Sequence, residues 1–282
     1  MKTYTKDMEG IFMVDLKQKP YFLNDEQIKY IEDKINEMSI EDKIGQLFFV
    51  VGQDSNTVNL SEFTKKYRPG GIMYRPDKAA KIKDEVSKIQ KASDIPLFVA
   101  ANLESGGNGI ASEGTWLGTP MEMAATGDFQ SAYQLGRISG YEAAQVGVNM
   151  SFAPIVDIDM NFKNPIMNVR TFGSDKNRVI GMSSAQAKGL EECGIIPVIK
   201  HFPGDGVDER DQHLLSSVNS LQADEWMESY GQIYRSLIEG GIPAVMIAHI
   251  LQPAWERRLD PGISDDRLRP ASSSKLLIDG LL

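Results

Sequence analysis

Residues 195–206 have the sequence IIPVIKHFPGDG, in which an apolar run passes directly into a polar turn. The apolar part, 195–199, is typical of a β-strand that is buried on both faces, as in parallel sheets. Similar runs occur at 47–51, 71–74, 96–101, 148–154 and 244–249. Helical patterns lie between most of these runs, for example Ile82, Val86 and Ile89. This alternation of strands and helices predicts parallel βα units.

Two architectures are built from such units: an open Rossmann-type sheet and a closed (β/α)8 barrel. No G-x-G-x-x-G follows the first run, although a Rossmann dinucleotide site would place one there. A glycine-rich stretch, 105–109, follows the third run but lacks the lysine of a phosphate-binding loop. We interpret this stretch as a flexible active-site loop, with a plain turn as the alternative.

The first residues predict a helical lead-in to the βα units. Asn24 with Gln27 has the spacing of a capping box, and so does Ser39 with Asp42. We therefore divide the chain into a lead-in, residues 1–37, and one domain, residues 38–282.

Composition excludes several classes of protein. The 282 residues are 41% hydrophobic and 24% charged, which excludes disorder as the main state. The net charge of −9 argues against a nucleic-acid partner, which needs a basic surface. No segment reaches the ~20 apolar residues of a membrane span, and no signal-peptide pattern opens the chain. The single cysteine, Cys193, excludes an intrachain disulfide, so we expect a cytoplasmic protein.

The three histidines, His201, His213 and His249, each lie at or beyond the end of a predicted strand. In parallel βα folds these carboxyl ends form the active-site face, so the histidines predict a functional site there. Lys200 and His201 need partners at a buried strand end, such as carboxylates or ligand hydroxyls. Asp211 and His213, two residues apart on a loop, can hydrogen-bond as an acid–base pair.

Several of these segments, taken in order, resemble the N-terminal barrel of glycoside hydrolase family 3, especially its β-N-acetylhexosaminidase branch. The most diagnostic segment is 200–206 (KHFPGDG). The others are 38–48 (MSIEDKIGQLF), 149–157 (NMSFAPIVD), 164–165 with 170–175 (NP, RTFGSD), and 248–249 with Pro253. The resemblance implies a (β/α)8 TIM-barrel type that is truncated after about six βα units.

The resemblance also implies a sugar site. Arg170, Lys200 and His201 would bind sugar hydroxyls, and Asp157 would orient Arg170 or Lys200. His213 would be the general acid/base and Asp211 its partner. Asn102 stands where the family usually has an aspartate that grips the sugar, and no arginine follows Gly106 and Gly107, which loosens the substrate assignment.

The family's nucleophile is an aspartate on the seventh strand, which we expect beyond Leu282. The apolar ending, 276–282, then becomes a sixth helix cut before that strand, and we expect this chain alone to be inactive. No cofactor and no metal site are expected.

The leading hypothesis is a retaining glycosidase that removes terminal β-linked N-acetylhexosamine or glucose. Phosphorolysis in place of hydrolysis is a variant of it. A non-catalytic sugar-binding protein or an inactive fragment that lacks the nucleophile is the alternative. Two open barrel edges also predict self-association.

Overall fold

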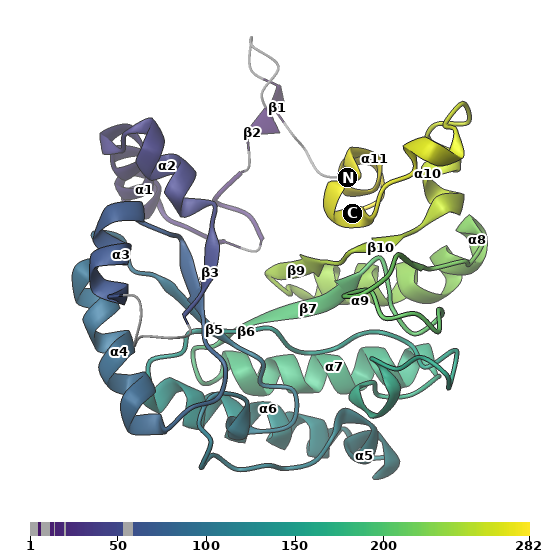
Figure 1. Ribbon diagram of the computed structural model, residues 1–282, viewed down its shortest axis with the longest axis horizontal. Helices are drawn as coiled ribbons and strands as arrows, with labels where there is room; N and C mark the ends of the chain where they lie inside the picture. The colour runs from purple at the N-terminus through teal and green to yellow at the C-terminus, as the bar shows by residue number, and fades with distance from the viewer. Residues whose placement is uncertain (1–4, 7–11, 14, 20, 53–58) are drawn as a thin grey trace.

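A six-stranded parallel sheet forms the centre of the computed structural model, which describes residues 5–6, 12–13, 15–19, 21–52 and 59–282 (Figure 1). The strands in spatial order are β3 (Phe49–Val51), β4 (Gly71–Met73), β5 (Phe98–Ala101), β6 (Met150–Ser151), β7 (Ile196–Phe202) and β9 (Ala244–Ile247). Five of the predicted apolar runs each contain one of these strands, whereas β7 begins in the run 195–199 and continues to Phe202. The order of the strands across the sheet is the same as their order along the chain. In a doubly wound sheet, by contrast, the strand order reverses at a switch point. The predicted barrel-type fold is therefore confirmed, and the Rossmann alternative is wrong.

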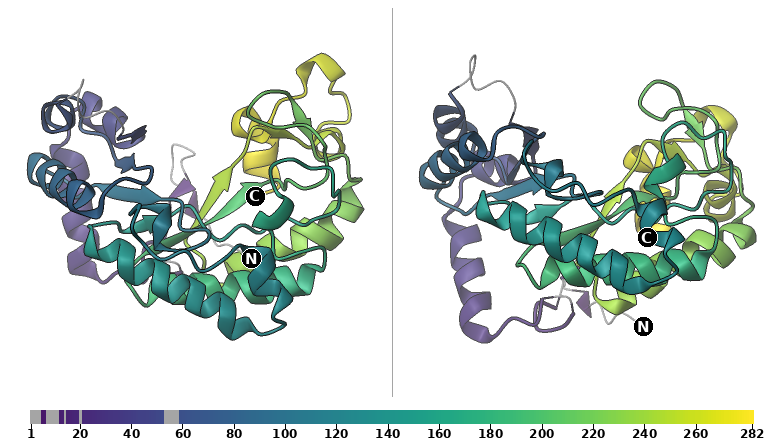
Figure 2. Two further views of the ribbon diagram at one scale, coloured as in Figure 1. Left: turned by 60° about the horizontal axis from the view of Figure 1, so that its bottom comes forward. Right: turned by 90° about the horizontal axis from the view of Figure 1, so that it is seen from below.

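Helices cover the outside of this sheet, which curls into a half-barrel (Figure 2). The helices that follow the strands are α3 (Leu60–Tyr67), α4 (Ala79–Ala92), α6 (Phe129–Gln145), α7 (Lys176–Glu191), α9 (Gln232–Gly240) and α11 (Lys275–Gly280). Their apolar faces pack on the sheet; α4, for example, buries Ile82, Val86 and Ile89. The helical spacing of these residues thus marks the face that the sheet covers.

Both predicted capping boxes are present, one in the lead-in and one at the start of the domain. The side chain of Asn24 accepts from the Gln27 amide at 2.9 Å and begins α1 (Asp25–Glu37). Ser39 accepts from the Asp42 amide at 3.1 Å and begins α2 (Ile40–Gln46). The lead-in also contains two short antiparallel strands that the sequence did not predict, β1 (Thr5–Lys6) and β2 (Phe12–Met13).

Several short elements were not predicted, because they are too brief to show a period. They are α3, α5 (Pro120–Ala125), β8 (Ser217–Val218), α8 (Ala223–Trp226), β10 (Ile250–Leu251) and α10 (Pro253–Leu259). Single 3-10 or π turns occur at Gly107–Gly109, Asn168–Arg170, Met227–Gly231, Asp265–Arg267 and Ala271–Ser273. Two helices, α10 and α11, therefore follow β9 where the sequence predicted one.

The glycine-rich stretch after β5 is a packed turn, so the prediction of a flexible loop is wrong. Backbone hydrogen bonds from Gly109 to Gly106 (3.2 Å) and from Ile110 to Gly107 (3.0 Å) close it. Gly107 and Ile110 are buried, and the turn packs on α6. Backbone groups that are bonded and buried in this way leave the segment little freedom.

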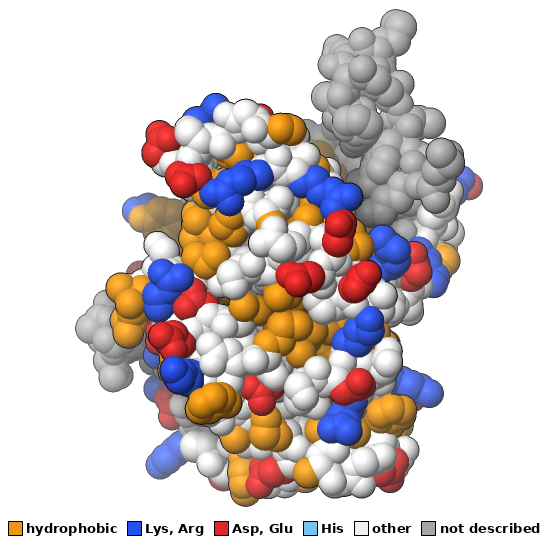
Figure 3. Space-filling model, turned by 90° about the vertical axis from the view of Figure 1, so that its right-hand side faces the viewer, with side chains coloured by type: hydrophobic (Ala, Val, Ile, Leu, Met, Phe, Trp, Pro, Cys, Tyr) orange, Lys and Arg blue, Asp and Glu red, His pale blue; other side chains and the backbone are white. Residues whose placement is uncertain are grey.

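Two surface properties bear on partners. No helix among the described residues is long and apolar enough to cross a membrane. On the face drawn in Figure 3, lysine and arginine side chains lie interspersed with aspartate and glutamate.

Candidate active site

Polar residues gather where β5, β6 and β7 end. Asn102 and Glu104 follow β5, Asp157 follows β6, and Lys200 and His201 close β7. Because the three strands are parallel neighbours, their carboxyl ends lie at one rim of the half-barrel. Residues that are far apart in the sequence are thereby brought into one cluster.

Glu104 is the centre of this cluster. Its carboxylate accepts two hydrogen bonds from Arg170, at 2.8 Å from Nε and 2.9 Å from Nη2. The buried ammonium of Lys200 lies 2.6 Å from Oε1 of Glu104 and 3.2 Å from Oδ1 of Asn102. One carboxylate therefore fixes both of the cations that were predicted to bind sugar hydroxyls. Glu104 was not among the predicted site residues, although Lys200 was expected to need a partner such as a carboxylate or the hydroxyls of a ligand.

The charges in the Glu104 cluster reinforce one another. Burial opposes ionisation of Glu104, but hydrogen bonds and charge from Arg170 and Lys200 outweigh it and lower its pKa to about 2. Burial lowers the pKa of Lys200, and the charge of Glu104 partly offsets that effect. A buried ion pair persists only where its geometry is good and its hydrogen bonds are satisfied, and the bidentate Arg170 contact meets this condition.

Asp157 has a different partner from the one predicted. It was expected to orient Arg170 or Lys200, but its Oδ2 lies 2.7 Å from Nδ1 of His201. Its Oδ1 accepts from the backbone amides of His201 (3.3 Å) and Asp205 (2.7 Å). The prediction was wrong because Glu104 already holds both cations. With Nδ1 held by Asp157, the other ring nitrogen of His201 is left for a ligand.

Asp211 and His213 form the predicted pair on the loop after β7. Nδ1 of His213 lies 2.7 Å from Oδ1 of Asp211, which also accepts from the His213 amide at 2.8 Å. These hydrogen bonds lower the pKa of Asp211, so its ionised carboxylate can hold the Nδ1 proton. The side chain of His213 is 67% exposed, and Nε2 is left to exchange a proton with a substrate.

The turn between β7 and this loop requires glycine. Gly204 and Gly206 have φ of +118° and +95°, a region that L side chains rarely adopt. A Cβ at Gly206 would lie 2.0 Å from the carbonyl oxygen of Ile158, and one at Gly204 would lie 2.4 Å from the ring of Tyr230. The peptide bonds Lys200–His201 and Phe202–Pro203 are cis.

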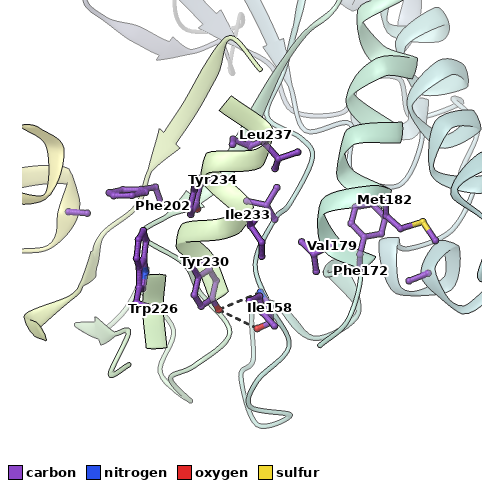
Figure 4. Packing of buried hydrophobic residues seen from close by; sticks show 14 of the residues in the cluster. Ile158, Phe172, Val179, Met182, Phe202, Trp226, Tyr230, Ile233, Tyr234 and Leu237 are labelled. Atoms are coloured by element: carbon purple, nitrogen blue, oxygen red, sulfur yellow. Dashed lines mark hydrogen bonds between the residues drawn. The ribbon is translucent and has the colours of Figure 1, made fainter. Parts of the chain in front are cut away.

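Aromatic residues support this turn from the outside of the sheet. The Tyr230 hydroxyl donates to the Asp205 carbonyl, and Figure 4 shows it also bonded to the backbone of Ile158. The Trp226 indole donates to the Pro203 carbonyl at 2.6 Å. Both rings are buried in the same apolar cluster, so the active-site turn is fixed by the core behind it.

His249, at the end of β9, lies on the same rim. Its Nδ1 is 2.8 Å from the Ser272 hydroxyl, and its backbone amide donates to Gln212 at 3.3 Å. Within the described ranges, no group of three or more His, Cys, Asp or Glu side chains could hold a metal ion.

Comparison with known proteins agrees with this geometry. The family model described as "Glycosyl hydrolase family 3 N terminal domain" matches residues 39–282. A "Beta-N-acetylglucosaminidase/beta-glucosidase" of Cellulomonas fimi is 40% identical over 270 residues, which are 96% of this chain and 48% of the relative.

Two solved structures extend the comparison. A "Beta-glucoside phosphorylase BglX bound to 2FGlc" superposes with a TM-score of 0.92 at 47% identity, covering 95% of this chain and 48% of the other. A family 3 β-N-acetylglucosaminidase from Paenibacillus sp. str. FPU-7 gives a TM-score of 0.75 at 26% identity. The match covers 86% of this chain and 46% of the other. The chain thus spans about half the length of these relatives.

Proposed function

Since the chain belongs to glycosyl hydrolase family 3, we propose that the protein cleaves terminal β-linked N-acetylhexosamine or glucose from a carbohydrate and retains the configuration of the sugar. The observation that carries this proposal is the Asp211–His213 pair on the loop that follows Lys200 and His201. An imidazole that is oriented by a carboxylate can act as a general acid/base. The relatives' names supply the two candidate sugars.

In this proposal the residues at the carboxyl-end rim of the half-barrel have separate roles. Lys200, Arg170, His201 and Asn102 donate hydrogen bonds to sugar hydroxyls, and Glu104 keeps the two cations in place. His213 protonates the leaving oxygen and later takes a proton from water. Retention also requires a carboxylate nucleophile, which we place outside the 282 residues. A cytoplasmic location is part of the proposal, and cell fractionation tests it.

Phosphate is the second candidate acceptor. The relative named β-glucoside phosphorylase is 47% identical to this chain over the part of its length that the two have in common. An imidazole base repels an incoming phosphate less than a carboxylate base would, because neutral histidine carries no negative charge. The same Asp211–His213 pair therefore suits either acceptor.

The decisive assay uses the protein encoded by the complete gene and two aryl substrates, a β-N-acetylglucosaminide and a β-glucoside. With water as acceptor, we expect free sugar to be released at a rate that added phosphate does not change. Formation of a sugar 1-phosphate in phosphate buffer would support the second candidate instead. Calorimetry that detects sugar binding, in the absence of any cleavage, would establish a non-catalytic sugar-binding protein.

We further propose that the 282-residue chain self-associates when it is produced alone. Among the residues that the structure describes, its sheet ends at β3 and β9, and Phe49 and Val51 on β3 are 43% and 57% exposed. Unpaired edge strands with apolar side chains pair readily with other chains. Light scattering after size exclusion should give a mass that rises with concentration, and Val51→Lys should reduce the rise. A concentration-independent monomer would contradict this expectation.

A further inference from the structure

Gln212 lies between Asp211 and His213 in the sequence, but its side chain is buried whereas that of His213 is exposed. Only 8% of Gln212 is exposed, compared with 67% of the His213 side chain. The proposed mechanism gives this buried amide no role. A buried polar side chain is costly unless it is hydrogen-bonded, so its partners show what it holds.

The amide of Gln212 joins two separate parts of the rim. Its Nε2 donates to Oδ2 of Asp205 at 2.9 Å, and Asp205 belongs to the turn after β7. Its Oε1 accepts from the backbone amide of His249 at 3.3 Å, where β9 ends. A carboxamide supplies one donor group and one acceptor at a fixed separation, and both are used here.

Asp205 connects this amide to the sugar site. The backbone amide of Asp205 donates to Asp157 at 2.7 Å, and the other oxygen of Asp157 holds His201 at 2.7 Å. The remaining oxygen of Asp205 accepts from Asn164 (2.8 Å) and from the Gly206 amide (2.7 Å). Asp205 is therefore fixed on several sides and provides Gln212 with a rigid anchor.

His213, by contrast, is exposed and needs such an anchor. Its ring is held by Asp211, whose own position depends on the loop. Backbone amides of Leu214 and Leu215 donate to the Asp211 carbonyl at 3.0 and 2.9 Å, so Asp211 and His213 lie in one hydrogen-bonded turn. A displacement of about 1 Å at a catalytic group can cost about 100-fold in rate.

We propose that Gln212 is a positioning residue, which holds the Asp211–His213 turn over the sugar site by bridging Asp205 and the His249 amide. The inference rests on the proposed role of His213 as acid/base. Glutamate at this position would place a second carboxylate against Asp205 and would lose the donor. Alanine would remove both contacts.

The test compares Gln212→Glu and Gln212→Ala in the protein encoded by the complete gene, with aryl glycosides whose leaving groups differ in acidity. A phenyl leaving group needs protonation, whereas a dinitrophenyl group leaves without it. We expect kcat/KM for the phenyl glycoside to fall about 10- to 100-fold, and that for the dinitrophenyl glycoside to change less than about threefold. Leu214→Ala, an exposed change in the same turn, is the matched control and should alter neither rate.

Two further measurements keep the outcomes distinct. His213→Ala should produce the same leaving-group dependence more strongly; if it does not, the proposed acid/base role fails. If His213→Ala produces it and both Gln212 variants lower the two rates equally, the positioning role of Gln212 is overturned. Hydrogen exchange at residues 207–216 should rise in Gln212→Glu but not in Leu214→Ala. Unchanged exchange in Gln212→Glu would also contradict the proposal.

Discussion

Replacing His213 by alanine in the protein encoded by the complete gene is expected to lower kcat/KM about 10²- to 10⁴-fold on a glycoside with a poor leaving group. The imidazole is the proton donor of the exposed Asp211–His213 pair, and alanine leaves no group there to protonate the departing oxygen. Steady-state rates with phenyl and dinitrophenyl glycosides measure the effect, which should be far smaller for the latter.

A control substitution next to His213 distinguishes a loss of catalysis from a loss of folding. Leu214 is 79% exposed and adjacent to His213, so Leu214→Ala should retain wild-type rates. Equal thermal midpoints of the two variants would show that both are folded. Wild-type hydrolysis of the phenyl glycoside by His213→Ala would refute the assignment of the acid/base.

Replacing Glu104 by glutamine is expected to cause the largest loss of stability, on the order of 3–5 kcal/mol. The change leaves Lys200, whose side chain is 4% exposed, without its carboxylate, and it breaks the bidentate contact with Arg170. Because both cations lose their position, kcat/KM should also fall by about 100-fold. Denaturant unfolding and steady-state kinetics measure the two effects.

The pH dependence identifies the cause of that loss. The pKa of Glu104 is about 2 in the folded chain, against an ordinary value of 4.5. A lowered folded pKa gives stabilisation that is complete above pH 4.5 and is lost as the pH falls towards 2. The difference in unfolding free energy between wild type and Glu104→Gln should therefore shrink over that range. Glu239→Gln, at an exposed site on α9, is the control and should show little difference at any pH. If the difference in unfolding free energy between wild type and Glu104→Gln does not change with pH, the lost charge of Glu104 is not the cause of the lower stability.

The architecture was predictable because its signals are local. Each buried strand is a short apolar run, and each capping box lies within four residues, as for Asn24 with Gln27. The Asp211–His213 pair was predictable for the same reason, since its members are two residues apart.

The hydrogen-bond and ion-pair partners within the site were not predictable, because they depend on which segments of the chain meet in the fold. Glu104 and Arg170 are separated by 66 positions, and Asp157 and His201 by 44. The sequence marks Asp157, Arg170 and His201 as candidate site residues but does not pair them. Asp157 was consequently given the wrong partner, and Glu104 and Gln212 were overlooked.

The contact between Gly204 and Tyr230 has an evolutionary consequence. A side chain at 204 would enter the space of the Tyr230 ring, whose hydroxyl also holds the Asp205 carbonyl. A tyrosine at 230 should therefore always occur with glycine at 204 among homologues. Because φ at 204 is +118°, glycine should be kept there even where residue 230 is smaller. Tyr230 precedes α9 and is fully buried. Its substitution rate should be as low as that of the residues that bind the sugar.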